Sequence, residues 1–206
     1  HHLLRRQRQM CIRDRSGKGN FKTLEDLVSA SKKAPLNWGV AQIGGTEHIG
    51  LAQFAKEAGI KFKVVPFGSG AQMVQALMAG KIDATLPNVS EAANQVADGS
   101  FRALAVMAED RLKDYPNVPS TYEKGIKAKC STTRGYAVLA STPQPIIDQI
   151  SKAMVKAMKH DVFKSYLAGA GLTVETSVAG TKVWDKHLKA EYKVAEAALK
   201  ELGLVK

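Results

Sequence analysis

The feature that most constrains the fold is an alternation of short apolar runs with amphipathic segments between residues 37 and 107. Runs rich in β-branched and aromatic residues predict strands over 38–43, 61–67, 82–86 and 101–107. Between them, apolar residues recur at helical spacing over 47–58, 71–79 and 91–98, with Ser90 as the expected N-cap of the last, and a glycine follows each segment. Strands joined by single short helices form βαβ units, so the sequence predicts an α/β fold around a parallel sheet.

The second half of the chain follows a different pattern. Residues 109–133 are predicted to form a long connection, and the apolar run at 134–140 predicts a fifth strand. Helices are expected over 145–160, 161–169 and 181–202, with a short strand over 172–176. The helix over 145–160 has an apolar face that we expect to point inward, formed by Ile146, Ile147, Ile150, Ala153, Met154, Ala157 and Met158.

The formal net charge of +11 would favour a nucleic-acid partner if the charge lay on the folded body. Instead, the first twenty residues contain six basic residues and one acidic residue, whereas residues 37–107 contain five of each. The stretch RRQRQMCIRDR lacks aromatic residues and the order of a signal peptide, and it resembles translated sequencing-adapter sequence. We therefore expect residues 1–19 to lie outside the fold and the natural N-terminus to be missing.

The motifs of enzymes and metal sites are incomplete. Cys11 and Cys130 are the two cysteines, and the body histidines have no ligand spacing, so neither a disulfide framework nor a metal site is predicted. Gly68-Ser69-Gly70 lacks the outer glycines of a nucleophile elbow, and Gly44-Gly45-Thr46 lacks the lysine of a phosphate-binding loop. The expectation is a protein without catalytic residues or a cofactor.

Candidate binding residues lie where three of the predicted strands lead into helices. In a parallel α/β sheet, ligands bind beyond the carboxyl ends of the strands, and glycine-rich turns at helix starts attract anions. Because residues 37–107 are neutral overall, backbone and hydroxyl donors would hold such an anion. The candidates are Gln42, Gly44, Gly45, Thr46 and His48, then Gly68, Ser69 and Gly70, then Pro87 and Asn88. The alternative is a structural role, with the glycines forming tight turns and His48 capping or packing.

Several motifs follow one another in a characteristic order: Val65–Ala71 (VPFGSGA), Gly80–Ala84 (GKIDA), Arg102–Val106 (RALAV) and Tyr115–Ser120 (YPNVPS). This order resembles the periplasmic solute receptors of tripartite tricarboxylate transporters, also called Bug receptors. The resemblance covers residues 21–206. It implies a type II periplasmic-binding-protein-like α/β fold, with one complete parallel-sheet lobe plus part of the second lobe.

The resemblance implies a ligand-binding lobe over 20–130 and a return segment to the other lobe over 131–206, after the basic tail over 1–19. Arg134 matches the arginine of a Trp-Arg-Gly element and is added to the candidate ligand-binding residues, although Thr133 replaces the tryptophan. Residues 140–143 also depart from the Pro-x-Gly-Thr-Pro turn of the family. Because the family's signal peptide and first-lobe glycine loop would precede residue 20, the chain resembles a receptor missing much of one lobe, and we expect it to bind its ligand weakly.

The function implied by the resemblance is a periplasmic receptor that binds a small carboxylate and delivers it to the membrane permease subunits of a tripartite transporter. No nucleic acid is expected as a partner. Two alternatives remain at this point. One is a fragment of an α/β enzyme that acts on a small anionic substrate, and the other is a nucleic-acid-binding module, motivated by net charge alone.

Overall fold

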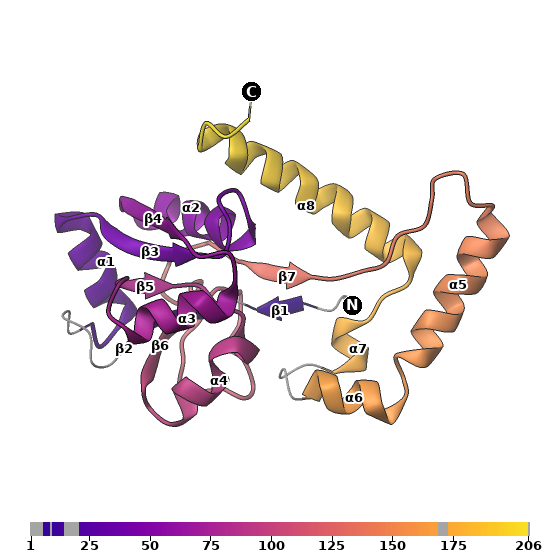
Figure 1. The fold of residues 1–206 in the computed structure, drawn as a ribbon, viewed down its shortest axis with the longest axis horizontal. Helices are drawn as coiled ribbons and strands as arrows, with labels where there is room; N and C mark the ends of the chain where they lie inside the picture. Colours follow the sequence, from indigo (N-terminus) through magenta and orange to yellow (C-terminus); the bar gives the residue numbers. More distant parts are fainter. Residues whose placement is uncertain (1–5, 9, 15–20, 169–172, 206) are drawn as a thin grey trace. The chain divides into compact units, whose positions relative to one another are not determined.

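The computed structural model describes residues 6–8, 10–14, 21–168 and 173–205, and it divides the chain into two compact units (Figure 1). One unit comprises Arg8–Ser131 and Ala198–Lys206 and is called the sheet unit below. The other is built on Thr132–Ala197, together with the start of the chain, and is called the helical unit. In the part of the chain that the structure describes, no helix has the length and apolar character of a membrane span.

The sheet unit contains a five-stranded sheet with the strand order β4-β3-β5-β2-β6. Strands β3 (Leu36–Val40), β4 (Phe62–Pro66) and β5 (Ala84–Thr85) are parallel, with Trp38 opposite Val64 on one side and Ala84 on the other. Helices α2 (Thr46–Ala58) and α3 (Gly70–Met78) connect them, and α4 (Val89–Ala97) leads to β6 (Phe101–Val106). The predicted succession of strands and helices is present, although β3 and β5 differ from the predicted ranges by several residues.

One strand of the sheet comes from residues 1–19, which were expected to lie outside the fold. Strand β2 (Met10–Asp14) lies between β5 and β6 and is antiparallel to both, so the sheet is mixed rather than purely parallel. Its pairing with β6 runs from Met10 opposite Val106 to Asp14 opposite Phe101. The expectation that residues 1–19 lie outside the fold is therefore wrong for residues 10–14. Strands β5 and β6 are not neighbours, and β2 supplies the hydrogen-bonding partner that each of them needs on its inner side.

Local signals explain where several helices begin and end. Helix α1 (Leu24–Lys33), which the strand-and-helix prediction lacks, starts at a capping box in which Thr23 and Asp26 satisfy each other's backbone N–H groups. Helix α2 ends at Gly59, whose φ of 63° is in the left-handed region. Helix α4 begins at Val89, one residue before the predicted N-cap Ser90, because Asn88 takes the cap position.

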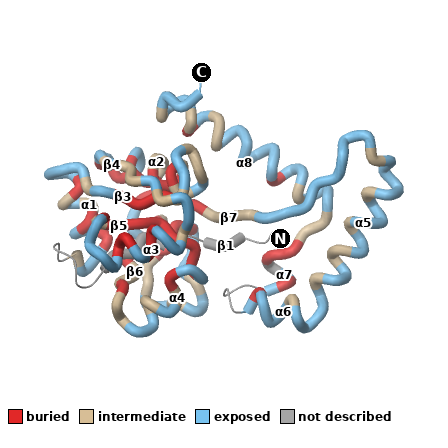
Figure 2. The backbone as a smooth tube through the Cα atoms, in the orientation of Figure 1, coloured by how far each residue is buried: buried red, intermediate tan, exposed pale blue. Residues whose placement is uncertain are grey.

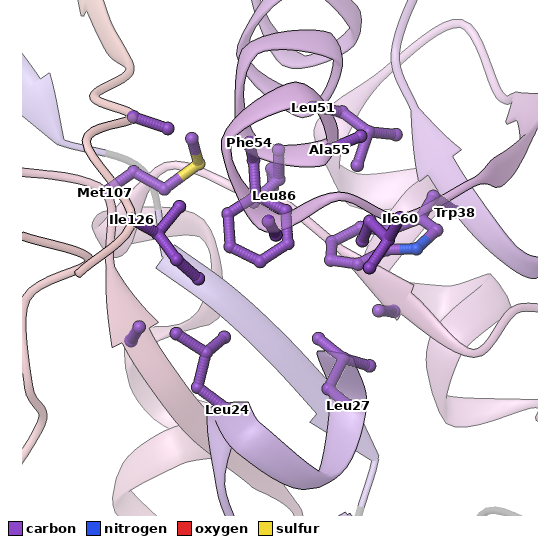
Figure 3. Packing of buried hydrophobic residues seen from close by; sticks show 14 of the residues in the cluster. Leu24, Leu27, Trp38, Leu51, Phe54, Ala55, Ile60, Leu86, Met107 and Ile126 are labelled. Atoms are coloured by element: carbon purple, nitrogen blue, oxygen red, sulfur yellow. The ribbon is translucent and has the colours of Figure 1, made fainter. Parts of the chain in front are cut away.

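The core of the sheet unit lies on both faces of the sheet. On one face, Leu24, Leu27, Leu51 and Phe54 from α1 and α2 pack around Trp38, whose ring lies 5.9 Å from that of Phe54 (Figure 3). On the other face, residues of α3, α4 and β6 form a second cluster that includes Val74, Leu77, Ala92 and Phe101. Figure 2 shows this burial concentrated on the strands and the inner sides of the helices. Burial from both sides fixes the strand ends, which carry the candidate site.

The helical unit has a much smaller core. It contains α5 (Gln144–Ala157), α6 (Asp161–Ala168), α7 (Val174–Ser177) and most of α8 (Thr181–Glu201), with one cluster around Leu167, Val174 and Val178. Helix α5 has no buried residue, and Ile146 and Ile150 are 46% and 39% exposed. Within the described residues, the predicted inward face of α5 is therefore largely uncovered, and Met158, directly after the helix, is the member of that face that packs against the small core.

Two predicted strands of the second half are wrong. Residues 134–140 form no strand; the short strand β7 (Ser131–Thr133) precedes them and pairs with β1 (Arg6–Arg8). Tyr136 and Leu139 are 76% and 78% exposed, so the described part of the chain supplies neither a neighbouring strand nor a core to cover this apolar run. Residues 174–176 belong to helix α7 because Val174 and Val178, one turn apart, both enter the small core.

Candidate functional site

The three junctions singled out by the sequence lie at one edge of the sheet. Because β3, β4 and β5 are parallel, the turns after them, at 41–45, 67–69 and 86–88, follow the same ends of the strands. The first two turns are joined directly: the N–H of Phe67 donates to the carbonyl of Val40 at 3.0 Å, and that of Gly68 donates to Ala41 at 2.8 Å. The parallel pairing of β3, β4 and β5 therefore brings the three turns to one edge of the sheet.

The first turn is organised by His48. This side chain is buried, and its Nδ1 accepts a hydrogen bond of 3.0 Å from the backbone N–H of Gly44. Gly44 has a φ of 74°, which favours glycine, and a Cβ atom there would lie 3.3 Å from Leu199 in the last turn of α8. Burial lowers the pKa of His48, so the imidazole is neutral and Nδ1 is available as an acceptor.

Several of the glycine N–H groups expected to face a ligand donate within the protein instead. Gly44 donates to His48, Gly45 donates to the carbonyl of Gln42 at 3.1 Å, and Gly68 donates to Ala41. Gly45 is also the N-cap of α2. Gln42 and Thr46 have exposed side chains, whereas the Thr46 carbonyl accepts from the thiol of Cys130 at 3.3 Å. This turn is mainly a rigid support.

The start of α3 has unused donors. Ser69 is the N-cap, and its hydroxyl accepts from the N–H of Gln72 at 3.3 Å. Within the described structure, the N–H groups of Ser69, Gly70 and Ala71 donate no hydrogen bond. The first N–H groups of a helix have no partner inside the helix and carry its positive dipole end. This turn is the part of the edge that can best bind an anion through backbone donors.

The third junction is more buried than the other two. Pro87 and Asn88 are both buried, and the N–H of Asn88 donates to the carboxylate of Glu91 at 2.9 Å. The Asn88 side chain is 4% exposed, and its Oδ1 has no hydrogen-bond donor in the described part of the chain. Asn88 is also the N-cap residue of the capping box that it forms with Glu91 at the start of α4.

Two carboxylates stand at this edge. Burial raises the pKa of the Glu47 carboxyl, its own backbone N–H partly offsets the rise, and the negative charge of Glu91 adds to it. The Glu91 carboxylate lies against Gly70, since a Cβ at residue 70 would be 2.6 Å from its Cδ. No lysine or arginine occurs in 41–48, 67–72 or 86–91. The edge therefore combines backbone N–H donors with negative side chains.

Arg134 lies in the helical unit, where its side chain is exposed. The neighbouring Gly135 packs against the indole of Trp184 so closely that a Cβ there would overlap the ring. The structure therefore gathers the other ten predicted residues at one edge of the sheet unit, and it places Arg134 in the other unit.

Glu91 and Cys130 are the contributors that sequence reasoning missed. The signal for Glu91 was present, because it stands three residues after Asn88, the spacing of a capping box. Cys130 had no local signal, since its contact with Thr46 joins residues 84 positions apart. Among the described residues, no group of three or more histidine, cysteine, aspartate or glutamate side chains could hold a metal ion.

The sequence and the fold match known receptors. Residues 15–204 match the sequence model of a family described as "Tripartite tricarboxylate transporter family receptor", TctC. A relative from Cupriavidus necator, called UPF0065 protein in gbd 5'region, is 24% identical over 188 residues, which are 90% of this chain and 57% of the relative. The chain thus spans little more than half of that protein's length.

Two solved structures from Rhodopseudomonas palustris share the fold. Rpa4515 with adipate has a TM-score of 0.80 and 22% identity, covering 98% of this chain and 67% of that one. MatC with bound malate has a TM-score of 0.79 and 20% identity, covering 96% and 68%. The predicted fold class is confirmed: the chain has the α/β fold of solute-binding receptors and matches about two thirds of each solved chain.

Proposed function

Because the chain belongs to the tripartite tricarboxylate transporter receptor family, we propose that it binds a small organic carboxylate at the sheet edge beyond β3, β4 and β5. The family and its solved relatives are solute-binding receptors rather than enzymes, so the enzyme-fragment alternative has no support. The two Rhodopseudomonas palustris receptors carry adipate and malate, both small carboxylates.

The observation that carries the proposal is the free start of α3. Three consecutive backbone N–H groups, from Ser69 to Ala71, donate no hydrogen bond within the described structure. They are therefore available to an acceptor on a ligand. A carboxylate oxygen accepts from such donors without a cationic side chain, and the helix dipole adds to the attraction. The turns after β3 and β5, the next two strands of the sheet, are held by their own internal hydrogen bonds.

The proposal is tested by removing one backbone donor. Ala71→Pro deletes the N–H at the second position of α3, where no helical hydrogen bond is lost. Ala71→Val is the matched control, because it adds similar bulk and keeps the N–H. We expect adipate and malate to shift the amide resonances of Gly68 and Gly70 in the ¹⁵N-labelled chain, and Ala71→Pro to weaken binding about tenfold, the value of one hydrogen bond to a charged group. Equal affinities for both variants would remove the start of α3 from the site.

We further propose that the receptor works in the periplasm and delivers its ligand to membrane permease subunits of a tripartite transporter. The family description supports this partnership by naming the transporter. Cross-linking of the chain to membranes that contain the permease subunits tests it, with membranes lacking them as the control. A cross-link that forms equally in both membranes would contradict this partnership.

A further inference from the structure

Residues near the end of the chain contact the turn after β3. Helix α8 ends in a Schellman motif, in which the N–H of Gly203 donates to the carbonyl of Lys200 at 3.0 Å and that of Leu204 donates to the carbonyl of Leu199 at 2.9 Å. This motif brings the apolar side chains of Leu199 and Leu204 together at the helix end. Both leucines belong to the sheet unit.

The two leucines pack against the backbone of Gly44. A Cβ added at Gly44 would lie 3.3 Å from Cδ2 of Leu199 and 3.6 Å from Cδ1 of Leu204. Apart from the chain neighbours of Gly44, no other described residue comes within 4 Å of that point. The same glycine donates its N–H to Nδ1 of His48 at 3.0 Å. A close apolar contact limits the access of water to this turn, so water competes less for the hydrogen bond.

An ion pair fixes how the end of α8 lies on α2. Nζ of Lys56, in the last turn of α2, lies 2.6 Å from Oε1 of Glu201. Both side chains are exposed, so the pair contributes little free energy. It orients the helix end, whereas the leucines supply the apolar contact with the turn.

The turn that the leucines contact is hydrogen-bonded to the next turn along the edge. Within the first turn, the N–H of Gly45 donates to the carbonyl of Gln42 at 3.1 Å. The carbonyl of Ala41 accepts from the N–H of Gly68 at 2.8 Å, and the next residue, Ser69, is the N-cap of α3. Contacts therefore run without a break from the end of α8 to the start of α3.

Resting on the carboxylate site proposed above, we propose that Leu199 and Leu204 are positioning residues, whose contact with Gly44 holds the turn after β3 in the shape that ligand binding requires. Without this contact the turn opens more often. Binding must then order the turn again, and the lost conformational entropy is subtracted from the binding free energy. The end of α8 thus sets the affinity without contacting the ligand.

Single substitutions in the full chain test the inference. Leu204→Ala removes one apolar contact beyond the end of the helix, and Leu199→Ala removes the other while keeping a strong helix former. Leu188→Ala is the matched control, because Leu188 lies in the same helix, is 44% exposed against 43% for Leu204, and belongs to the helical unit. Glu201→Gln is a second control, which removes the ion pair and keeps both leucines.

Two measurements without a ligand report on the turn. Hydrogen exchange of the Gly44 amide follows the opening of its bond to His48, and an NMR titration gives the pKa of His48. We expect each leucine variant to speed this exchange about tenfold, the value of one hydrogen bond. Because burial lowers the pKa of His48, a looser turn should raise it towards its ordinary value. Neither control should change the exchange or the pKa.

A reference amide separates positioning from a general loss of stability. Phe54 is fully buried in the core of the sheet unit, so its amide exchanges through larger openings than the turn requires. Its exchange should stay the same in the leucine variants. An equal acceleration at Phe54 and Gly44 would mean that the leucines stabilise the whole unit, and it would overturn the positioning role.

The affinities for adipate and malate complete the test. Titrations of the ¹⁵N-labelled variants should show binding about fivefold weaker for each leucine variant, a loss typical of one surface contact, and unchanged binding for the two controls. If Gly44 exchange is unchanged, or if it speeds up while both affinities stay the same, the inference is overturned and the carboxylate receptor stands. If neither compound binds the unmodified chain, the proposed function fails, and the inference fails with it.

Discussion

The backbone N–H of Gly44 donates a 3.0 Å hydrogen bond to Nδ1 of His48, and this bond closes the turn between β3 and α2. Nδ1 can accept only while the imidazole is neutral, and burial favours the neutral form. The His48 ring also forms a T-shaped pair with the ring of Phe62 in β4, with 6.2 Å between ring centroids. His48 thus ties the first turn to the neighbouring strand.

The first prediction concerns pH. A histidine with a lowered folded pKa contributes stability that is fully present above its unfolded pKa of about 6.5 and is lost as the pH falls through the folded pKa. The melting temperature should therefore fall with pH below about 6.5. His48→Asn can still accept from Gly44 but does not titrate, so it should show a weaker fall. Parallel pH curves for the two proteins would contradict the assignment to His48.

The second prediction concerns Gly45→Val. A Cβ at this position would lie 3.2 Å from both the Cβ and the carbonyl oxygen of Gln42, so the turn must open. We expect weaker carboxylate binding by several-fold, with a loss of stability below about 1 kcal/mol because Gln42 is exposed. Calorimetry and urea unfolding measure the two effects. Unchanged affinity would remove this turn from the site.

The third prediction concerns the core of the sheet unit. Phe54 is fully buried against Trp38, so Phe54→Ala should lower the free energy of unfolding by about 3–5 kcal/mol. Met78, also in the sheet unit and 52% exposed, is the comparison, and Met78→Ala should change it by less than about 0.5 kcal/mol. In a Trp184→Phe background, Trp38 fluorescence reports on this unit alone. Similar losses for both substitutions would show that Phe54 is not a core residue.

The fourth prediction contrasts two residues of the helical unit. Leu167 is fully buried, and Leu167→Ala should destabilise the unit by about 2–4 kcal/mol. Ile150 is 39% exposed on a helix without buried residues, so Ile150→Lys should leave its stability within about 0.5 kcal/mol. Urea unfolding followed by circular dichroism compares them. A large loss for Ile150→Lys would mean that the apolar face of α5 is covered.

Helices α2, α3 and α4 and the glycines that follow them were predictable because their signals are local. The glycine after α2 and the apolar spacing within it lie in one short stretch of chain. Parallel pairing then required that the three turns share one edge, which is why the candidate residues from Gln42 to Asn88 meet there. The prediction of a strand over 134–140 was wrong because an apolar run does not by itself provide the neighbouring strand with which its backbone could form hydrogen bonds.

The sequence by itself determined the order of strands and helices from β3 to β6 and the turns at which a ligand can meet helix starts. Only the tertiary structure decided that residues 10–14 enter the sheet, that the N–H of Gly44 is used by His48, and that Glu91 lies against Gly70. Helix spacing and glycine stops act within a few residues of chain. Strand pairing and side-chain contacts join residues far apart in the sequence, so they depend on how the whole chain packs.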